Sequence, residues 1–180
     1  GKFELGGMAS ADLTGTEAIR FSGTTIGTVQ PAAELKAAAD LAFHGAVVSP
    51  ASYTRARILA PGRTVSFSRT TDVPTQPLSA QGGLAIDAKH IEQDGNLWAP
   101  FGQLEFNASE SLVFKKGSLT SVAAAAGSLL PFGKTQNGRE WVVDLDPSKV
   151  PTGQLVQGEL AGKAVRVSGQ SVDMQAGAKV

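Results

Sequence analysis

Short pairs of apolar residues, each flanking one polar or small residue, recur along this chain. The first five pairs start 22, 24, 19 and 20 residues apart. The alternation within each pair is typical of a β-strand in which every second side chain points inward. A period near twenty that varies by a few residues predicts a solenoid whose coils differ in length. The pairs are Ile19/Phe21, Leu41/Phe43, Val65/Phe67, Leu84/Ile86, Leu104/Phe106 and Val165/Val167.

Two further apolar positions indicate two more short strands in many of the coils. The second position lies seven or eight residues after the start of a pair, at Ile26, Val48, Ile91, Leu112 and Val172. The third lies thirteen to fifteen residues after that start, at Leu78, Leu97 and Leu119. Three strands per coil, each paired in parallel with its equivalent one coil later, predict an all-β parallel β-helix of about six coils. Equivalent inward side chains then stack, so we expect Phe21, Phe43, Phe67 and Phe106 to form an aromatic ladder interrupted by Ile86.

Two stretches interrupt this rhythm. Pro31–Asp40 is rich in Ala, Glu, Leu and Lys, and its composition leaves a short helix and a strand of the coil as open alternatives. Residues 127–162 contain two apolar runs, Leu129–Phe132 and Glu140–Val143, on either side of the pair Asn137-Gly138. Asn-Gly between two apolar runs is the strongest short-range signal of a β-hairpin. We therefore expect a hairpin excursion that folds back over one side of the coil.

These patterns divide a single domain into three parts. Residues 1–126 form the main β-helix coils, 127–162 the hairpin and loop excursion, and 163–180 a last coil. The chain has 180 residues and begins at Gly1 without a signal peptide, so we expect it to be a fragment of a longer chain.

Bulk composition argues against several classes of function. The formal net charge is zero, which is atypical of surfaces that bind nucleic acid or anionic membranes. The sequence contains no run of eighteen apolar residues, so no membrane span is predicted. Cysteine is absent, which excludes disulfides and thiolate metal sites and suits a chain that crosses a membrane unfolded.

Several short elements follow one another in a specific order between Leu41 and Val143. They are Pro77-Leu78-Ser79-Ala80, Leu84-Ala85-Ile86-Asp87-Ala88, Gly95-Asn96-Leu97-Trp98-Ala99-Pro100-Phe101-Gly102, Gly117-Ser118-Leu119-Thr120-Ser121-Val122 and Pro131-Phe132-Gly133. This succession resembles the conserved region of filamentous-haemagglutinin-like large exoproteins, which Gram-negative bacteria export by two-partner secretion. The resemblance continues more loosely to the C-terminus and points to an internal or C-terminal portion of such a protein.

The resemblance implies a right-handed β-helix in a secreted, cell-surface adhesin that supports cell adhesion. It also implies an outer-membrane transporter as the partner during export. A host glycan or protein receptor is a further partner to test, and we expect neither nucleic acid nor a membrane span as part of the function. The alternatives are a ligand-binding module on the same β-helix and, less favoured, a carbohydrate-active enzyme.

An enzymatic function is one alternative, because β-helices also carry enzymes that act on polysaccharides. The densest polar cluster contains Asp87, Lys89, His90, Glu92, Gln93 and Asp94. A pair of carboxylates on one coil face can act as acid and base, but a solvated turn is the preferred explanation, because the aligned positions Ser68 and Asn107 add no further carboxylates. His44 and His90 lie nearly two coils apart, without a ladder of acids between them. We therefore expect no enzymatic activity, no catalytic residues, no metal and no cofactor.

Exposed aromatic residues are the better lead to a function. If Leu97 and Ala99 point inward, Trp98 points outward. Trp141 lies on the predicted hairpin, and Tyr53 follows a surface turn at Pro50. Outward Trp and Tyr side chains stack on sugar rings or anchor protein interfaces. The alternative for the two tryptophans is that they pack on each other or on the hairpin and so fix the excursion to the coil.

Overall fold

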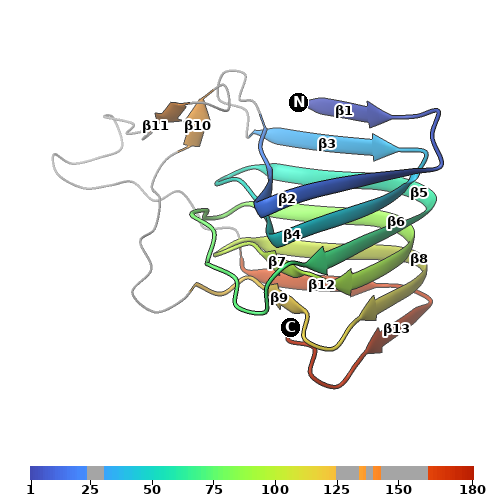
Figure 1. Cartoon of the computed structure of the whole chain (residues 1–180). Helices are drawn as coiled ribbons and strands as arrows, with labels where there is room; N and C mark the ends of the chain where they lie inside the picture. Colours follow the sequence, from blue (N-terminus) through green and yellow to red (C-terminus); the bar gives the residue numbers. More distant parts are fainter. Residues whose placement is uncertain (24–30, 125–133, 137–139, 143–161) are drawn as a thin grey trace, which may run out of the picture.

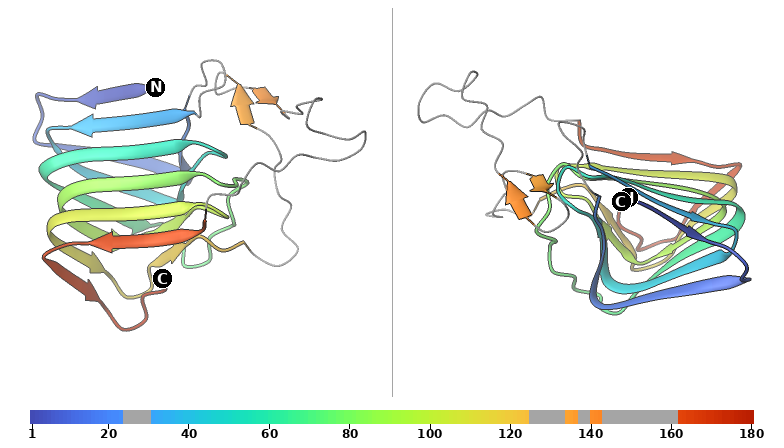
Figure 2. Two further views of the ribbon diagram at one scale, coloured as in Figure 1. Left: turned by 180° about the vertical axis from the view of Figure 1, so that it is seen from behind. Right: turned by 90° about the horizontal axis from the view of Figure 1, so that it is seen from above.

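The computed structural model describes residues 1–23, 31–124, 134–136, 140–142 and 162–180. Within these ranges the chain is all-β and contains no helix, which confirms the all-β prediction. It winds repeatedly around one interior, so that strands pair in parallel with strands from the next passage of the chain (Figure 1). We call one such passage a coil. Viewed along the stack, the strands enclose the interior almost completely (Figure 2).

The strands differ widely in length because the longer ones continue around a corner from one face of the coil to the next. Their bounds are β1 (Lys2–Leu5), β2 (Ser10–Phe21), β3 (Ala32–Ala37), β4 (Asp40–Pro50), β5 (Arg55–Arg69), β6 (Gly83–Asp94), β7 (Asn96–Trp98), β8 (Gln103–Phe114), β9 (Leu119–Ser121), β10 (Lys134–Gln136), β11 (Glu140–Val142), β12 (Ala164–Ser168) and β13 (Ser171–Met174).

The first face contains β1, β3, the first parts of β5, β6 and β8, and β12. Every neighbouring pair is parallel and in register. Its inward side chains therefore stack in columns, and the central column is apolar throughout, because each position would otherwise place a polar group in the interior. That column consists of Phe3, Leu35, Ile58, Ile86, Phe106 and Val167.

The second face contains the first parts of β2 and β4, the second parts of β5, β6 and β8, and β13. One of its inward columns consists of Leu13, Phe43, Phe67, Gln93, Phe114 and Met174. The rings of Phe43 and Phe67 stack with their centroids 5.1 Å apart and an interplanar angle of 14°. This face thus contains an aromatic pair within an otherwise mixed column.

The third face is shorter and contains the ends of β2 and β4 together with β7 and β9. Here β4 pairs directly with β7 through Val48 and Leu97. Residues 70–82 leave the stack as a loop, so this coil contributes no strand to the face. Buried Asn96 fixes the loop, since its amide nitrogen donates to Ala46 O at 2.8 Å and to Thr71 O at 2.9 Å.

The predicted inward pairs are confirmed where the coils are complete. Leu41/Phe43, Val65/Phe67, Leu84/Ile86 and Leu104/Phe106 are all buried. The predicted aromatic ladder is correct only in part. Phe21, Phe43 and Phe67 contact one another in the predicted order, with ring centroids 5.9 Å and 5.1 Å apart. Phe21, however, lies on the third face opposite Pro50, and Phe106 lies on the first face, where its ring packs edge-on against Phe114 with the centroids 5.3 Å apart. The pairs are real, but they belong to different faces.

Other local predictions have clear outcomes. Pro31–Asp40 contains strand β3, so the strand alternative is correct. Antiparallel pairing of β10 with β11 places Gln136 opposite Glu140, as expected for a hairpin around Asn137-Gly138, although residues 137–139 lie outside the described residues. Leu78 is 69% exposed in the 70–82 loop, so its prediction as an inward residue is wrong.

Gln93 occupies a buried position in the column between Phe67 and Phe114, and its amide group is fully bonded. Its Nε2 donates to Gly95 O, Leu119 O and Thr120 Oγ1, each at 3.1 Å, while Oε1 accepts from Gly95 N at 3.1 Å. Gln93→Leu is expected to lower the free energy of unfolding by about 1–3 kcal/mol, because Gly95 N and the Thr120 hydroxyl lose their hydrogen bonds to the amide. Urea unfolding measures this loss; a more stable variant would show that the apolar column outweighs these hydrogen bonds.

Candidate functional site

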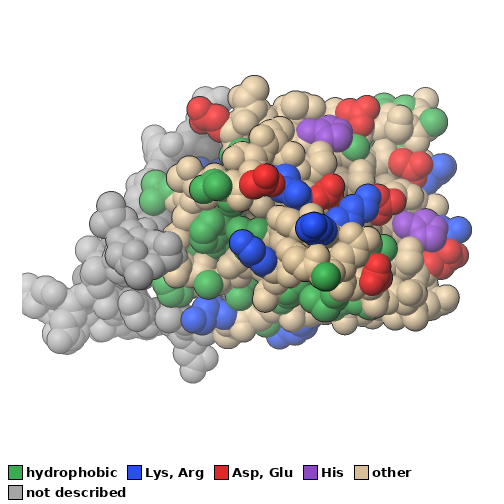
Figure 3. Space-filling model, turned by 60° about the horizontal axis from the view of Figure 1, so that its bottom comes forward, with side chains coloured by type: hydrophobic (Ala, Val, Ile, Leu, Met, Phe, Trp, Pro, Cys, Tyr) green, Lys and Arg blue, Asp and Glu red, His purple; other side chains and the backbone are tan. Residues whose placement is uncertain are grey.

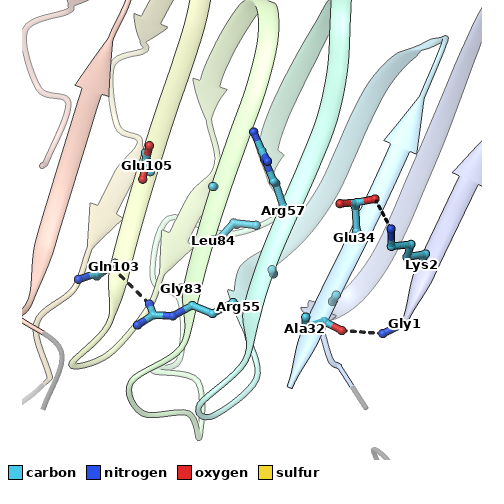
Figure 4. Close-up of a pocket in the computed structure, with 13 residues that line it drawn as sticks. Gly1, Lys2, Ala32, Glu34, Arg55, Arg57, Gly83, Leu84, Gln103 and Glu105 are labelled. Atoms are coloured by element: carbon cyan, nitrogen blue, oxygen red, sulfur yellow. Dashed lines mark hydrogen bonds and ion pairs between the residues drawn. The ribbon is translucent and has the colours of Figure 1, made fainter. Parts of the chain in front are cut away.

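A groove of about 700 Å³ lies on the outside of the first face and crosses β1, β3, β5, β6 and β8 (Figure 4). Its size falls in the range of small-ligand sites, about 300–1,000 Å³. The residues that line it come from neighbouring rungs of the parallel sheet. They are Gly1, Lys2, Ala32, Ala33, Glu34, Arg55, Ala56, Arg57, Gly83, Leu84, Ala85, Gln103 and Glu105.

The groove exists because small residues interrupt rows of long side chains. One outward row runs through Lys2, Glu34, Arg57, Ala85 and Glu105. Its long members alternate in charge, and the methyl group at Ala85 leaves a gap between the guanidinium group of Arg57 and the carboxylate of Glu105. Two strand spacings separate the backbones that carry these groups, which is about 9.6 Å.

A second row, through Ala32, Arg55, Gly83 and Gln103, forms one wall of the groove. The side chain of Arg55 lies across Gly83, and its Nη1 donates to Gln103 Oε1 at 3.3 Å (Figure 4). A Cβ atom at position 83 would lie 2.7 Å from Nη1 of Arg55. Glycine at this position therefore permits the bridge between β5 and β8 over β6.

The charged groups around Ala85 form a connected network. Arg57 Nε donates to Asp87 Oδ2 at 2.8 Å. Asn107 Nδ2 donates both to Asp87 Oδ1 at 3.2 Å and to Glu105 Oε1 at 3.1 Å. The hydrogen bond from Arg57 to Asp87, reinforced by the attraction between their charges, raises the pKa of Arg57 above its usual value. The network thus holds donors and acceptors in fixed positions along the groove.

This network supports binding better than acid–base catalysis. Asp87 and Glu105 share one amide donor and are close neighbours, as the two carboxylates of a glycosidase are. However, both carboxylates are engaged in hydrogen bonds within the network, since Asp87 accepts from Arg57 and Asn107, and Glu105 accepts from Asn107. Within the described ranges, no group of three or more His, Asp or Glu side chains is arranged to hold a metal ion.

One edge of the first face carries a column of residues with left-handed backbone conformation. Tyr53, Gln81 and Phe101 have φ values of 61°, 60° and 55°. Their N–H groups donate to the next coil, at Ala80 O, Pro100 O and Val122 O respectively. Each lies two residues before a member of the groove wall, namely Arg55, Gly83 and Gln103. A column with two aromatic members therefore borders the groove.

The aromatic residues singled out from the sequence lie in different settings. Tyr53 is 43% exposed in this corner column. Trp98 is half-buried on the third face, and its indole Nε1 donates to Ala123 O at 2.6 Å. Trp141 lies in β11 opposite Thr135 in the backbone pairing, and its side chain lies outside the described part of the structure.

Sequence reasoning missed the groove and the role of Phe101 at its border. The groove depends on the small side chains of Gly83 and Ala85, which carry no chemical signal of their own. A correct register would have revealed it, because only the register places Gly83 between Arg55 and Gln103 and Ala85 between Arg57 and Glu105.

Charged side chains of both signs also lie outside the groove. Figure 3 shows Lys and Arg side chains interspersed with Asp and Glu side chains over one face of the molecule. Several of these groups form ion pairs between adjacent coils, among them Lys115–Glu92 at 2.5 Å and Lys89–Glu110 at 3.2 Å. In the described residues, no helix has the length and apolar character needed to cross a membrane.

Comparison of the chain with models of protein families, with characterised proteins and with solved structures finds no match.

Proposed function

We propose that this chain is a segment of a right-handed parallel β-helix within a secreted bacterial exoprotein of the filamentous-haemagglutinin type. Its function is structural: it extends the rod that supports cell adhesion. The sequence elements that resemble this family support the proposal through their positions. Ala99–Gly102 forms the corner where the third face meets the first, and Gly117–Thr120 leads into β9 at the other end of that face.

The observation that carries the proposal is the continuity of the inward columns. They run from coil to coil, and their terminal members remain exposed although they are apolar. Phe3 is 61% exposed at one end, while Val167 and Met174 are 40% and 55% exposed at the other. Further coils stacked on these ends would bury them, as the neighbouring rungs of a longer solenoid do.

Export provides the test. The chain is placed behind a two-partner secretion domain in a bacterium that carries the matching outer-membrane transporter. We expect it to reach the medium and to become protease-resistant there. In the double variant Ala42→Cys/Ser66→Cys, the two cysteines face each other in register on adjacent strands. A disulfide formed between them in the oxidising periplasm is expected to block export, because the chain can no longer cross the membrane unfolded.

The single variant Ala42→Cys is the matched control and is expected to be exported normally. Failure of the parent chain to reach the medium would contradict the proposal. So would equal export of the double variant with its disulfide formed, because the chain would then cross the membrane already folded.

The second candidate function is a ligand-binding module on the same coil, and the groove beside Tyr53 favours it. Glycan panels and intact host cells provide the ligands. The variant Trp98→Ala/Trp141→Ala tests the two tryptophans, after circular dichroism has established that it folds. Loss of saturable binding in the folded variant would assign the site to the hairpin side, whereas unchanged binding would assign it elsewhere.

A further inference from the structure

We propose that the groove on the first face binds a neutral oligosaccharide, which lies along the coil axis over β3, β5, β6 and β8. This inference rests on the second candidate function, binding of a ligand, and is independent of the first. It identifies the site as the gap over Ala85 and the ligand as a chain of uncharged sugar units.

The groove presents donors and acceptors within short reach of each other. Arg55 and Arg57 supply N–H donors, Glu34 and Glu105 supply carboxylate acceptors, and the amide of Gln103 supplies both. A sugar hydroxyl donates one hydrogen bond and accepts two. A neutral ligand with many hydroxyl groups can therefore bond to the carboxylate and guanidinium groups of the same groove without bringing a charge that one of them would repel.

Charge pairing within the groove argues against a polyanionic ligand. Lys2 Nζ lies 3.8 Å from Glu34 Oε1, and Arg57 is bonded to Asp87 at 2.8 Å. Glu105 stands on the far side of the gap from Arg57 and would repel an anionic group placed there. Lys2 and Arg57 are thus paired with nearby acids, and a neutral ligand avoids the cost of separating these pairs.

The repeat of the fold suits a repeating ligand. Neighbouring rungs present equivalent positions at intervals of about 4.8 Å, and a hexose unit in a chain is about as long as one such interval. At the border of the groove, Tyr53 is 43% exposed and offers aromatic surface for the C–H face of a sugar ring, and Phe101 lies two rungs away. The ammonium group of Lys163 lies 5.8 Å from the ring centroid of Phe101.

A peptide added as an extra strand does not fit this site. Such a peptide binds to the open edge of a sheet through its main chain. The groove lies instead on the face of the sheet, where β3, β5, β6 and β8 are already paired along the stretch that lines it. Only side chains are presented to a ligand there.

The experiment measures binding of the 180-residue chain to tetrasaccharides of glucose, mannose, galactose and N-acetylglucosamine by isothermal titration calorimetry. A sulfated tetrasaccharide forms a separate arm. Ala85→Ile fills the gap between Arg57 and Glu105 with a residue that favours strands. Ala42→Ile is its matched control, because Ala42 also points outward from a strand but lies on the second face.

We expect at least one neutral tetrasaccharide to bind, with a Kd raised about tenfold or more by Ala85→Ile and changed less than about twofold by Ala42→Ile. The sugar should be recovered uncleaved. If tetrasaccharides bind but Ala85→Ile leaves the Kd of each of them unchanged, the proposed site is wrong, while the binding function remains. Binding of the sulfated tetrasaccharide alone would overturn the ligand class, and cleavage would overturn binding as the function of the groove. No binding in any arm would overturn the oligosaccharide proposal, and the ligand-binding function would fall with it only if intact host cells also failed to bind the chain.

Discussion

Phe43→Asp is expected to leave the chain unfolded in water. The side chain of Phe43 is completely buried and lies in its column between Leu13 and Phe67. Loss of a buried phenyl ring costs about 3–5 kcal/mol, and an unpaired carboxylate in the interior adds several more. Together these costs rival the whole free energy of unfolding of a typical domain, about 5–15 kcal/mol.

Far-UV circular dichroism and urea titration measure the outcome for Phe43→Asp. The control is Ala42→Asp, because the neighbouring side chain in the same strand points outward. Its new carboxylate faces Asp12 and Ser66 in solvent, so we expect a folded protein with a loss of about 1 kcal/mol or less. A cooperatively folded Phe43→Asp variant would show that the inward and outward positions of β4 are assigned the wrong way round.

The alternation along each strand could be predicted because it is local. In a strand that is half-buried, a period of two separates inward from outward residues without knowledge of any partner. Leu41/Phe43 and Leu104/Phe106 were therefore placed inward correctly from the sequence. The Asn137-Gly138 signal is also local, and β10 and β11 pair antiparallel around it. The first strand of this pair is Lys134–Gln136, whereas the run Leu129–Phe132 lies outside the described residues.

The register between coils could not be predicted in the same way, because different faces carry similar patterns. The pair Val65/Phe67 is opposite Ile91/Gln93, while Leu84/Ile86 is opposite Ala56/Ile58. Ala56 is too small and Gln93 too polar to stand out as members of an apolar pair. Gln93 is tolerated inside only because its amide is bonded on both sides to the following turn and to β9, a feature that requires the fold to be known.

The groove shows the consequence of this difference for function. Arg57, Asp87 and Glu105 are ordinary surface residues in the sequence, and the spacing of 48 residues between Arg57 and Glu105 suggests no relation. The register brings them together on three consecutive rungs, with Ala85 between them. A site built across rungs depends on stacking, so the network can form only if the coils are correctly paired.

The second large effect is expected at Gly102, which lies in the corner after Phe101. A Cβ atom at this position would lie 1.8 Å from the carbonyl oxygen of Gly82 in the preceding coil. That oxygen accepts a hydrogen bond from Gln103 N at 3.0 Å, so it cannot turn away without breaking the pairing of the first face. The Cβ atom is fixed to the backbone of one coil and the oxygen belongs to the backbone of the other. No rotation of a side chain can relieve the clash, so Gly102→Ala must displace one coil relative to the other.

We expect Gly102→Ala to lower the free energy of unfolding by about 3 kcal/mol or more and the Tm by about 6–12 °C, as measured by urea and thermal unfolding. Gly6→Ala is the control, since a Cβ atom there would have no neighbour within 4 Å, and its Tm should change by no more than about 2 °C. Equal stability of the two variants would mean that the backbones of Gly82 and Gly102 can move far enough apart to accommodate a Cβ atom without loss of pairing. The close approach of Gly82 and Gly102 also fixes the position of Gln103, so the same substitution is expected to weaken any binding in the groove that depends on the bridge from Arg55.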